Sequence, residues 1–192
     1  MSKNLQPVAA EAILYAKKEI EKYGVPDHQH FDFSIEKAQQ LAELLDARID
    51  LVSIGTALMD VKLGQAFQEE RIGEHVAMSM DAADIFLAPF HLSEGDVSVI
   101  LNSVEAHHGG VPFLSIEAEI CANADCYKFI HPKGVFIYLT VLGKRLGDYQ
   151  SCLNQAEAKM DEKMNIISLP VVKEELEPFY KVFKQYFAMS RQ

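Results

Sequence analysis

The chain has 192 residues, 49% of them hydrophobic, so it is long enough to bury a substantial core and to fold as one domain. It carries 18 Lys and Arg against 28 Asp and Glu, a formal net charge of −10, with no block of basic residues. A polynucleotide backbone or an anionic membrane needs a concentrated cationic face, so the composition argues against nucleic acid and membrane as main partners. A small anionic substrate remains compatible if a metal ion supplies positive charge.

The sequence carries no sign of export. The first twenty residues have charges every few positions and no uninterrupted apolar run, which argues against a signal peptide or a transmembrane helix. The three cysteines are odd in number and form no Cys-x-x-Cys pair, which favours reduced thiols packed in a core over disulfides or a zinc knuckle. We therefore expect a cytoplasmic protein, whose oligomeric state the sequence does not indicate.

Apolar residues recur at helical spacing along nearly the whole chain. The first such segment starts at Pro7 and stops at Gly24, a residue typical of a helix C-terminal cap. The same 3.6-residue period marks residues 33–47, 49–58, 76–87, 97–107, about 116–164, and 171–189. In the last of these, Pro178 should kink or interrupt the helix, because a mid-helix proline removes a backbone hydrogen bond. No segment shows the period-two alternation of a strand, so the sequence predicts an all-α fold.

Short groups of Gly, Pro and Ser separate the periodic segments, as in "YGVPDHQH", "HLSEGD", "HHGGVPF", "IHPKG" and "SLP". None is long enough to be an interdomain linker, and the chain has neither internal repeats nor low-complexity tracts. We therefore expect residues 1–192 to form one compact helical bundle.

Two aspartates and several histidines suggest a metal site. Asp60 ends the apolar run "LVSIGTALMD", and Asp125 lies in the largely apolar segment "EAEICANADCYKF". Burying a lone carboxylate is costly unless it is paired or bound to a cation. Either aspartate taken alone is better explained as a helix cap or a member of a buried salt bridge. Together with the adjacent His107 and His108 they favour a shared cation, because a helical bundle builds a metal site from several facing helices.

The His-His pair allows two assignments. Neighbouring residues on a helix point about 100° apart, so only one of His107 and His108 is expected to face the site. The slightly more apolar face of the helix favours His107 as the ligand. His108 would then contact substrate or interact with the negative end of the helix dipole.

The order of these residues resembles the HD-domain superfamily of metal-dependent phosphohydrolases, whose pattern runs His, His-Asp, further His, Asp. The matching residues, in chain order, are His30, Met59-Asp60, His75, His107-His108 and Asp125. The surrounding segments "HFDFSIEKAQQLAELL", "IGTALMDVKLG" and "SIEAEICANADCYKF" agree with the family over about residues 27–129. Residues 134–190 are similar to the C-terminal helices of short, stand-alone bacterial members. The chain departs from the pattern at Met59, where the family has His.

The resemblance implies a bundle of helices around a divalent metal centre and hydrolysis of phosphate esters, commonly of nucleotides. His30, Asp60 and Asp125 would hold the first metal ion, which is one nitrogen short because a thioether is a poor ligand for Mg²⁺ or Mn²⁺. His75 and one of the adjacent histidines match the positions of a second ion. The metal expected is Mn, Fe, Ni or Mg.

On this hypothesis the chain hydrolyses a small phosphorylated compound through a metal-activated water, with Asp60 as ligand and general base. Lys62, Arg71 and His108 are the candidate substrate contacts. The alternative is a non-catalytic domain that binds a metal or a nucleotide, or that serves as a helical interaction module, because Met59 replaces the family's histidine.

Overall fold

The structure, a computed structural model, describes residues 4–191 of the chain. Ten α-helices and two short 3-10 helices occur in this range, and it contains no strand, so the predicted all-α fold is confirmed. The elements are α1 (Gln6–Tyr23), α2 (His28–Leu44), α3 (Ile49–Leu58), α4 (Leu63–Gln68), η1 (Ile72–Glu74), α5 (His75–Leu87), η2 (Ala88–Phe90), α6 (Glu94–Ala106), α7 (Ile116–Ile130), α8 (Pro132–Leu146), α9 (Tyr149–Ile166) and α10 (Pro170–Met189).

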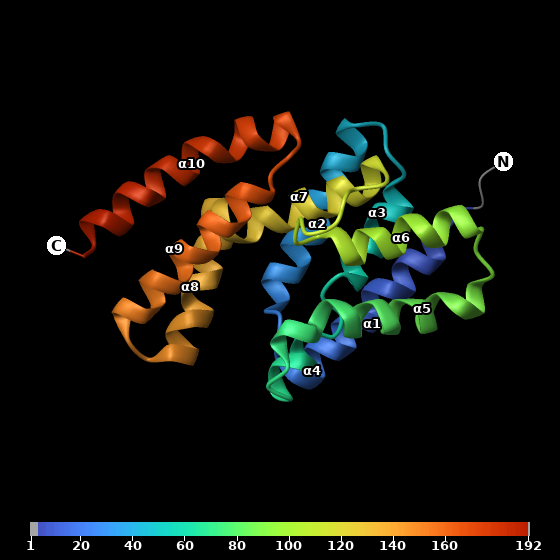
Figure 1. Ribbon diagram of the computed structural model, residues 1–192, viewed down its shortest axis with the longest axis horizontal. Helices are drawn as coiled ribbons and strands as arrows, with labels where there is room; N and C mark the ends of the chain where they lie inside the picture. Colours follow the sequence, from blue (N-terminus) through green and yellow to red (C-terminus); the bar gives the residue numbers. More distant parts are fainter. Residues whose placement is uncertain (1–3, 192) are drawn as a thin grey trace.

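Helices α2 and α7 lie in the middle of the molecule, with α1, α3, α5 and α6 to one side and α8, α9 and α10 to the other (Figure 1). Each side has its own hydrophobic cluster, and α2 contributes to both. Phe33 and Leu41 belong to the cluster shared with α7 to α10, whereas Phe31 and Ile35 belong to the cluster shared with α1, α3, α5 and α6. The apolar stripe of α2 thus connects the two sides.

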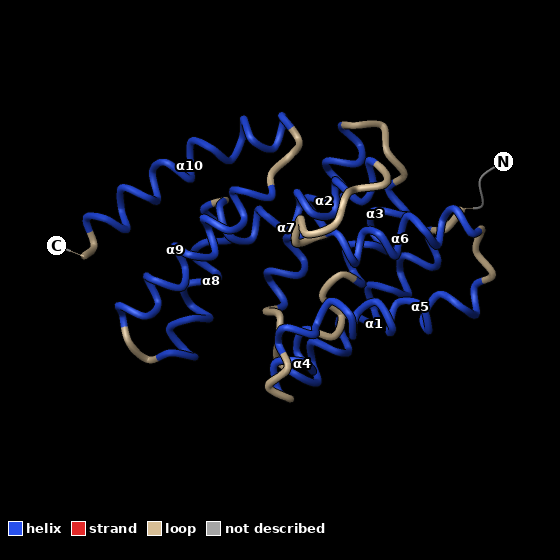
Figure 2. Tube along the Cα trace, in the orientation of Figure 1, coloured by secondary structure: helices blue, strands red, loops and turns tan. Residues whose placement is uncertain are grey.

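Local sequence explains where the helices begin and end, and Figure 2 shows that the connections between them are mostly short. Gly24 ends α1 in the left-handed conformation, with φ at 72°, which glycine adopts without a steric penalty. Asp27 then caps α2, because its side chain accepts a hydrogen bond of 2.8 Å from the backbone N–H of Gln29. These caps fix the entry to α2 and place His30 in its first turn.

The long periodic segment predicted from about residue 116 to 164 is three helices, α7, α8 and α9. The first break lies in the expected "IHPKG" stretch, where His131 is extended before Pro132 and its side chain accepts a hydrogen bond from the N–H of Lys133. The second break was not predicted. Gly147 ends α8 in the left-handed conformation, and Asp148 caps α9 by accepting from the N–H of Ser151.

Pro178 does not interrupt the last helix, which runs unbroken from Pro170 to Met189. Pro178 lies on an exposed part of α10, where water can satisfy the carbonyl that the proline leaves without a donor. On the opposite face, Leu176 and Phe183 are buried on either side of the proline in the same hydrophobic cluster. Packing of this face therefore holds both halves of the helix in place.

Two further expectations concern the state of the cysteines and membrane-spanning helices. Cys121, Cys126 and Cys152 are free and buried, as predicted, and burial raises the pKa of Cys121 to about 11 and that of Cys126 to about 12. None of the described helices is both long and apolar enough to cross a bilayer.

The first turn of α8 lies directly against the last turn of α7, and Gly134 permits this contact. A Cβ atom at Gly134 would lie 2.5 Å from the carbonyl oxygen of Lys128 and 2.6 Å from its carbonyl carbon, closer than real Cβ contacts allow. The same glycine offers its own carbonyl to His30, whose Nε2 lies 2.8 Å away. Gly134 thus helps to place residues from α2, α7 and α8 together.

We expect Gly134→Ala to lower the free energy of unfolding by about 1–3 kcal/mol, because backbone atoms cannot move aside as a flexible side chain would. Gly143→Ala is the matched control on the same helix, since a Cβ there meets nothing within 4 Å. It should leave stability unchanged or raise it by up to about 1 kcal/mol. Urea unfolding followed by circular dichroism measures both. Equal stability of the two variants would contradict the close packing described for α7 and α8.

Candidate metal centre

A buried helix delivers Asp60 to the site. Residues 51–58 of α3 are all buried, and Met59, which follows them, is only 2% exposed. Asp60 comes next, in the turn before α4. The backbone N–H of Lys62 donates a hydrogen bond of 3.1 Å to Ser79 Oγ, which ties this turn to α5. The carboxylate is therefore held at the junction of α3 and α5.

His75 and His107 are oriented by backbone carbonyls. Nδ1 of His75 lies 2.7 Å from the carbonyl oxygen of Ile72, and Nδ1 of His107 lies 2.7 Å from that of Val104. A carbonyl oxygen can only accept, so Nδ1 carries a proton in both rings and Nε2 is the nitrogen that faces the site. Backbone hydrogen bonds of this kind fix the tautomer of metal-binding histidines.

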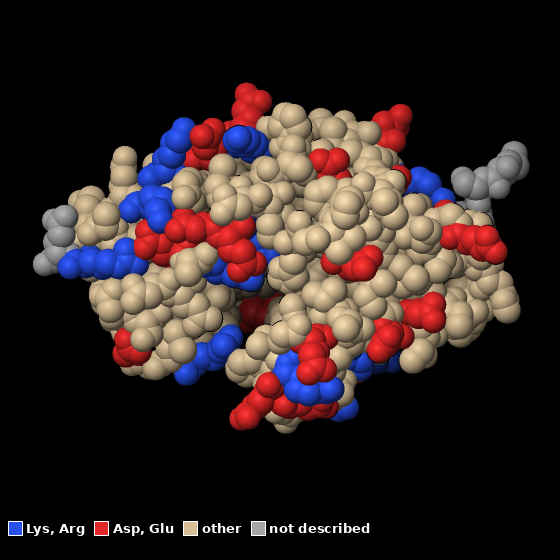
Figure 3. All heavy atoms as spheres, viewed as in Figure 1, with Lys and Arg blue, Asp and Glu red and all other residues tan. Residues whose placement is uncertain are grey.

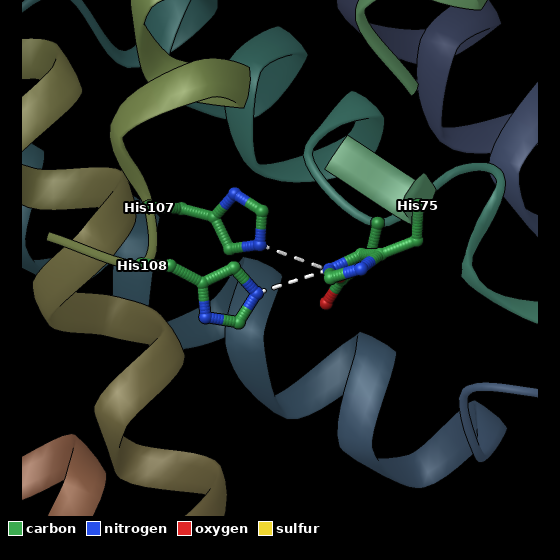
Figure 4. Close-up of side chains that lie close together, drawn as sticks. His75, His107 and His108 are labelled. Atoms are coloured by element: carbon green, nitrogen blue, oxygen red, sulfur yellow. Dashed lines mark hydrogen bonds and ion pairs between the residues drawn. The ribbon is translucent and has the colours of Figure 1, made fainter. Parts of the chain in front are cut away.

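The three rings of His75, His107 and His108 point toward one another from the start of α5 and the end of α6 (Figure 4). Nε2 of His75 lies 3.0 Å from Nε2 of His108. The structure brings both members of the His-His pair to the site, whereas one was expected. Both rings take part because His75, on α5, lies against each of them, with ring centroids 6.0 Å from His107 and 5.1 Å from His108.

Together with Asp60 these histidines form a group that fits a metal ion. Asp60, His75, His107 and His108 each offer one ligand atom, and these atoms all lie within 4.8 Å of one another. Oδ1 of Asp60 lies 3.4 Å from Nε2 of His107 and 3.7 Å from Nε2 of His75. Nε2 of His107 is fully buried, and no hydrogen-bond partner occurs for it among residues 4–191. A buried lone pair without a donor is what a metal ligand requires before the ion binds.

Asp125 lies in a buried salt bridge. Its Oδ2 is 2.6 Å from Nζ of Lys163, and its Oδ1 is 2.5 Å from Nζ of Lys128. The Lys128 ammonium also lies 3.2 Å from Oδ2 of Asp60. The two aspartates expected to share a cation therefore do share one in the structure, and it is the side chain of Lys128.

All four of these groups are held in their charged forms. Burial alone would raise the pKa of Asp60, but the Lys128 ammonium keeps that pKa well below its usual range. Burial acts in the same way on Asp125, and Lys128 and Lys163 again lower its pKa. The carboxylates of Asp125 and Asp60 in turn raise the pKa of Lys128 against the effect of its burial.

His30 lines the same cleft but stands apart from the four-residue group. Its Nε2 lies 2.8 Å from the carbonyl oxygen of Gly134, to which it donates. Burial lowers the pKa of His30 to about 4, so the ring is neutral near pH 7. The predicted ligands therefore separate into two sets: Asp60, His75 and His107 converge with His108, whereas His30 and Asp125 are engaged with other protein groups.

The two cationic candidates for substrate contact lie away from this cleft. Nζ of Lys62 pairs with Oε2 of Glu19 at 2.8 Å. Arg71 is exposed and pairs with Glu69 at 2.7 Å and with Glu74 at 3.1 Å. Neither side chain lines the cleft around Asp60.

The cleft has a volume of about 620 Å³ and lies between the two sides of the molecule. Figure 3 shows a hollow in the middle of this face, with basic atoms at its edge and acidic atoms at depth. Five basic side chains line it against three acidic ones: Lys128, Lys144, Arg145, Lys159 and Lys163 against Asp27, Asp60 and Asp125. Phe67, Phe129 and Tyr138 add aromatic surface. The chain is acidic overall, yet this cleft gathers positive charge.

Sequence reasoning missed Lys128 and Lys163. Lys128 could have been recognised as a partner of Asp125, because it follows Asp125 by three residues on a largely apolar helix. Residues three apart share a helix face. Lys163 lies on α9 among polar residues, where no local pattern distinguishes it from a solvated lysine.

Comparisons with known proteins show the fold. No protein-family model matches the chain. Ribonuclease Y of Finegoldia magna is 33% identical over 95 residues, which are 50% of this chain and 17% of ribonuclease Y, so the chain spans only a small part of that protein. A crystal structure from Lactobacillus plantarum superposes with a TM-score of 0.73 at 15% identity, covering 100% of this chain and 97% of that one. Bacillus subtilis YpgQ gives a TM-score of 0.64 at 18% identity, with 97% and 95% covered. The chain therefore shares the all-helical fold of YpgQ-like proteins and carries a His and Asp cluster able to hold a metal ion.

Proposed function

We propose that the chain is an HD-type, metal-dependent phosphohydrolase that acts on a small phosphorylated compound, with nucleotides as the first class to test. The observation that carries the proposal is the convergence of one carboxylate and three imidazoles, those of Asp60, His75, His107 and His108, beside a cationic cleft. The ordered His and Asp residues, the YpgQ-like fold and the match to ribonuclease Y support it. Ribonuclease Y is by its name an enzyme acting on RNA, whose backbone is joined by phosphate esters.

The donor set favours a transition metal. Three imidazole nitrogens and one carboxylate oxygen suit Mn, Fe or Ni better than Mg, which prefers oxygen ligands. A bound ion of this kind lowers the pKa of a water molecule and offsets charge on phosphoryl oxygens. Burial lowers the pKa of His108, which keeps this ring neutral and able to act as a ligand near pH 7.

The electrostatics of the site favour Asp60 as a ligand. A carboxylate whose pKa is held well below its usual range remains ionised, and it is a weak proton acceptor. Asp60 would therefore hold the ion as a charged ligand and would orient the water molecule that the ion activates. This differs from the general-base role expected from the sequence.

The cleft suits a small anion with a ring. Its volume of about 620 Å³ falls in the range of small-molecule sites, and its basic side chains favour phosphate. Phe129 and Tyr138 lie in edge-to-face contact with ring centroids 5.0 Å apart, and the guanidinium of Arg145 lies 4.5 Å from the ring centroid of Phe67. These groups offer apolar and stacking surface beside the phosphate-binding side.

A non-catalytic domain that binds a metal or a nucleotide is the second candidate. It is favoured by the ion pairs of Asp60 and Asp125 with Lys128, which already neutralise both carboxylates. Such a domain would bind Mn²⁺ and nucleotide with no hydrolysis above the uncatalysed rate.

We expect protein purified without added ions to contain Mn, Fe or Ni, and His107→Ala to weaken binding of the ion by at least about 10-fold, because the buried lone pair of Nε2 is lost. Elemental analysis and calorimetric titration with Mn²⁺ measure this. His28→Ala, at an exposed position on α2, is the control and should leave affinity unchanged. If no metal is found, and divalent ions neither raise the melting temperature nor support hydrolysis, the enzyme hypothesis fails.

Asp60→Asn should reduce kcat/KM for an aryl phosphate or a nucleotide at least about 100-fold, equivalent to about 2.7 kcal/mol of transition-state stabilisation. The amide keeps the shape of the side chain but loses the charge that the ion requires. Asp84→Asn, on an exposed part of α5, is the matched control and should retain full activity. Equal activity of the two variants would show that hydrolysis occurs elsewhere or belongs to a contaminant.

A further inference from the structure

Lys128 is a buried cation between two carboxylates that are distant in sequence. Its side chain is 5% exposed, and its Nζ lies 3.2 Å from Oδ2 of Asp60 and 2.5 Å from Oδ1 of Asp125. Nζ of Lys163, whose side chain is 1% exposed, lies 2.6 Å from the other oxygen of Asp125. Two ammonium groups and two carboxylates thus form a chain, Lys163–Asp125–Lys128–Asp60, in which charges of opposite sign alternate.

This arrangement leaves no place for a divalent ion between Asp60 and Asp125. Both oxygens of Asp125 lie within ion-pair distance of lysine ammonium groups, although Oδ1 makes no hydrogen bond, and Nε2 of His30 is engaged by the carbonyl oxygen of Gly134. An ion there would also be repelled by two ammonium groups. His30, Asp60 and Asp125, the set that the sequence assigns to a first metal ion, therefore do not fit such an ion in this chain.

Asp60 divides its two oxygens between two different surroundings. Oδ2 faces the Lys128 ammonium, whereas Oδ1 faces the imidazoles of His107 and His75. The second side has the imidazole nitrogens of the four-residue group, one of them buried without a hydrogen-bond partner, so it can take a divalent ion. Lys128 also lines the cleft, where a bound phosphate would meet its charge.

We propose that the Lys128 ammonium is a built-in cation that replaces one metal ion, so that the folded chain takes a single divalent ion, on the imidazole side of Asp60. The single ion rests on the proposed function, whereas the role of Lys128 rests on its own contacts. Lys128 then supplies a fixed positive charge to the substrate's phosphoryl oxygens from the side opposite the ion. It is thus a further substrate-binding residue, in addition to those expected from the sequence.

Met59 lies beside the ion pair of Lys128 and Asp60. Its buried side chain lines, together with Asp60 and Lys128, a cavity of only about 10 Å³, which barely reaches the size needed for one water molecule. A histidine at position 59 could bind a metal ion only if the Lys128 ammonium were removed. Substitutions at residues 59 and 128 should therefore be strongly non-additive.

The test counts Mn²⁺ ions bound per chain, by equilibrium dialysis with elemental analysis, in wild type, Met59→His, and the double variant Met59→His with Lys128→Ala. We expect one ion in wild type, one in Met59→His and two in the double variant. Lys133→Ala is the control, because this exposed lysine pairs with Glu36 at 3.4 Å on the surface and should not alter the count. Two ions in wild type or in Met59→His, or no additional ion in the double variant, would overturn the proposal.

A further substitution separates this proposal from the proposed function. Adding His107→Ala to the double variant should remove the ion on the imidazole side and retain the new one. If wild type binds no ion but the double variant binds one, the proposed function fails and the assignment of Lys128 stands.

The melting temperature provides a second measurement. It can be used even if a variant is unfolded in the absence of metal. Loss of Lys128 leaves two carboxylates facing each other, so Lys128→Ala should melt at a lower temperature in EDTA than wild type. Mn²⁺ should raise its melting temperature by more than it raises that of wild type, or restore its circular dichroism spectrum if the variant is unfolded in EDTA. Failure of Mn²⁺ to do either would refute the view that the ammonium replaces a metal ion.

Discussion

The chain of ion pairs from Lys163 through Asp125 and Lys128 to Asp60 is the constraint on which the site depends. It joins α9 and α7 to the turn that follows α3, and so connects the two sides of the molecule at the floor of the cleft. Removing one member of a buried ion pair costs about 3–5 kcal/mol, because the remaining charge is left without a partner. Each buried charge therefore depends on the position of the next one, which ties the placement of these elements together.

This constraint also sets the chemistry that Asp60 can perform. One of its oxygens is held by Lys128, which leaves the other in a defined position facing His75 and His107. Those rings are themselves oriented by carbonyl oxygens of their own helical turns. The ligand atoms are thus placed by backbone and buried charge before any ion binds, which reduces the reorganisation that binding requires. A carboxylate with a low pKa and two oriented rings thus form a preorganised group that is able to hold a metal ion.

Much of the fold could be predicted from the spacing of apolar residues and from the Gly, Pro and Ser residues that separate the helices. What could not be predicted depends on contacts between residues far apart in the sequence. Buried apolar helices such as α3 were visible in sequence, and so was the cost of placing Asp60 at the end of one. The burial of Asp125 was equally visible, but whether its partner is a metal ion or an ammonium depends on Lys163, which another helix brings in from 38 residues away in sequence. The joint approach of His107 and His108 depended on His75, which α5 brings against both rings and which no local pattern places there. Tertiary context decided each of these points.

The contrast between the acidic chain and its basic cleft narrows the kind of ligand the site can accept. With a net charge of −10, most of the surface repels anions, whereas the cleft is lined by five basic side chains against three acidic ones. Screening limits this repulsion to about 8 Å at physiological ionic strength, so a small anion inside the cleft experiences mainly the local cations. On the acidic exterior beyond the cleft, a long polyanion would meet charge of its own sign. The charge distribution thus favours a compact anion, because the basic side chains of Lys128, α8 and α9 gather in the cleft.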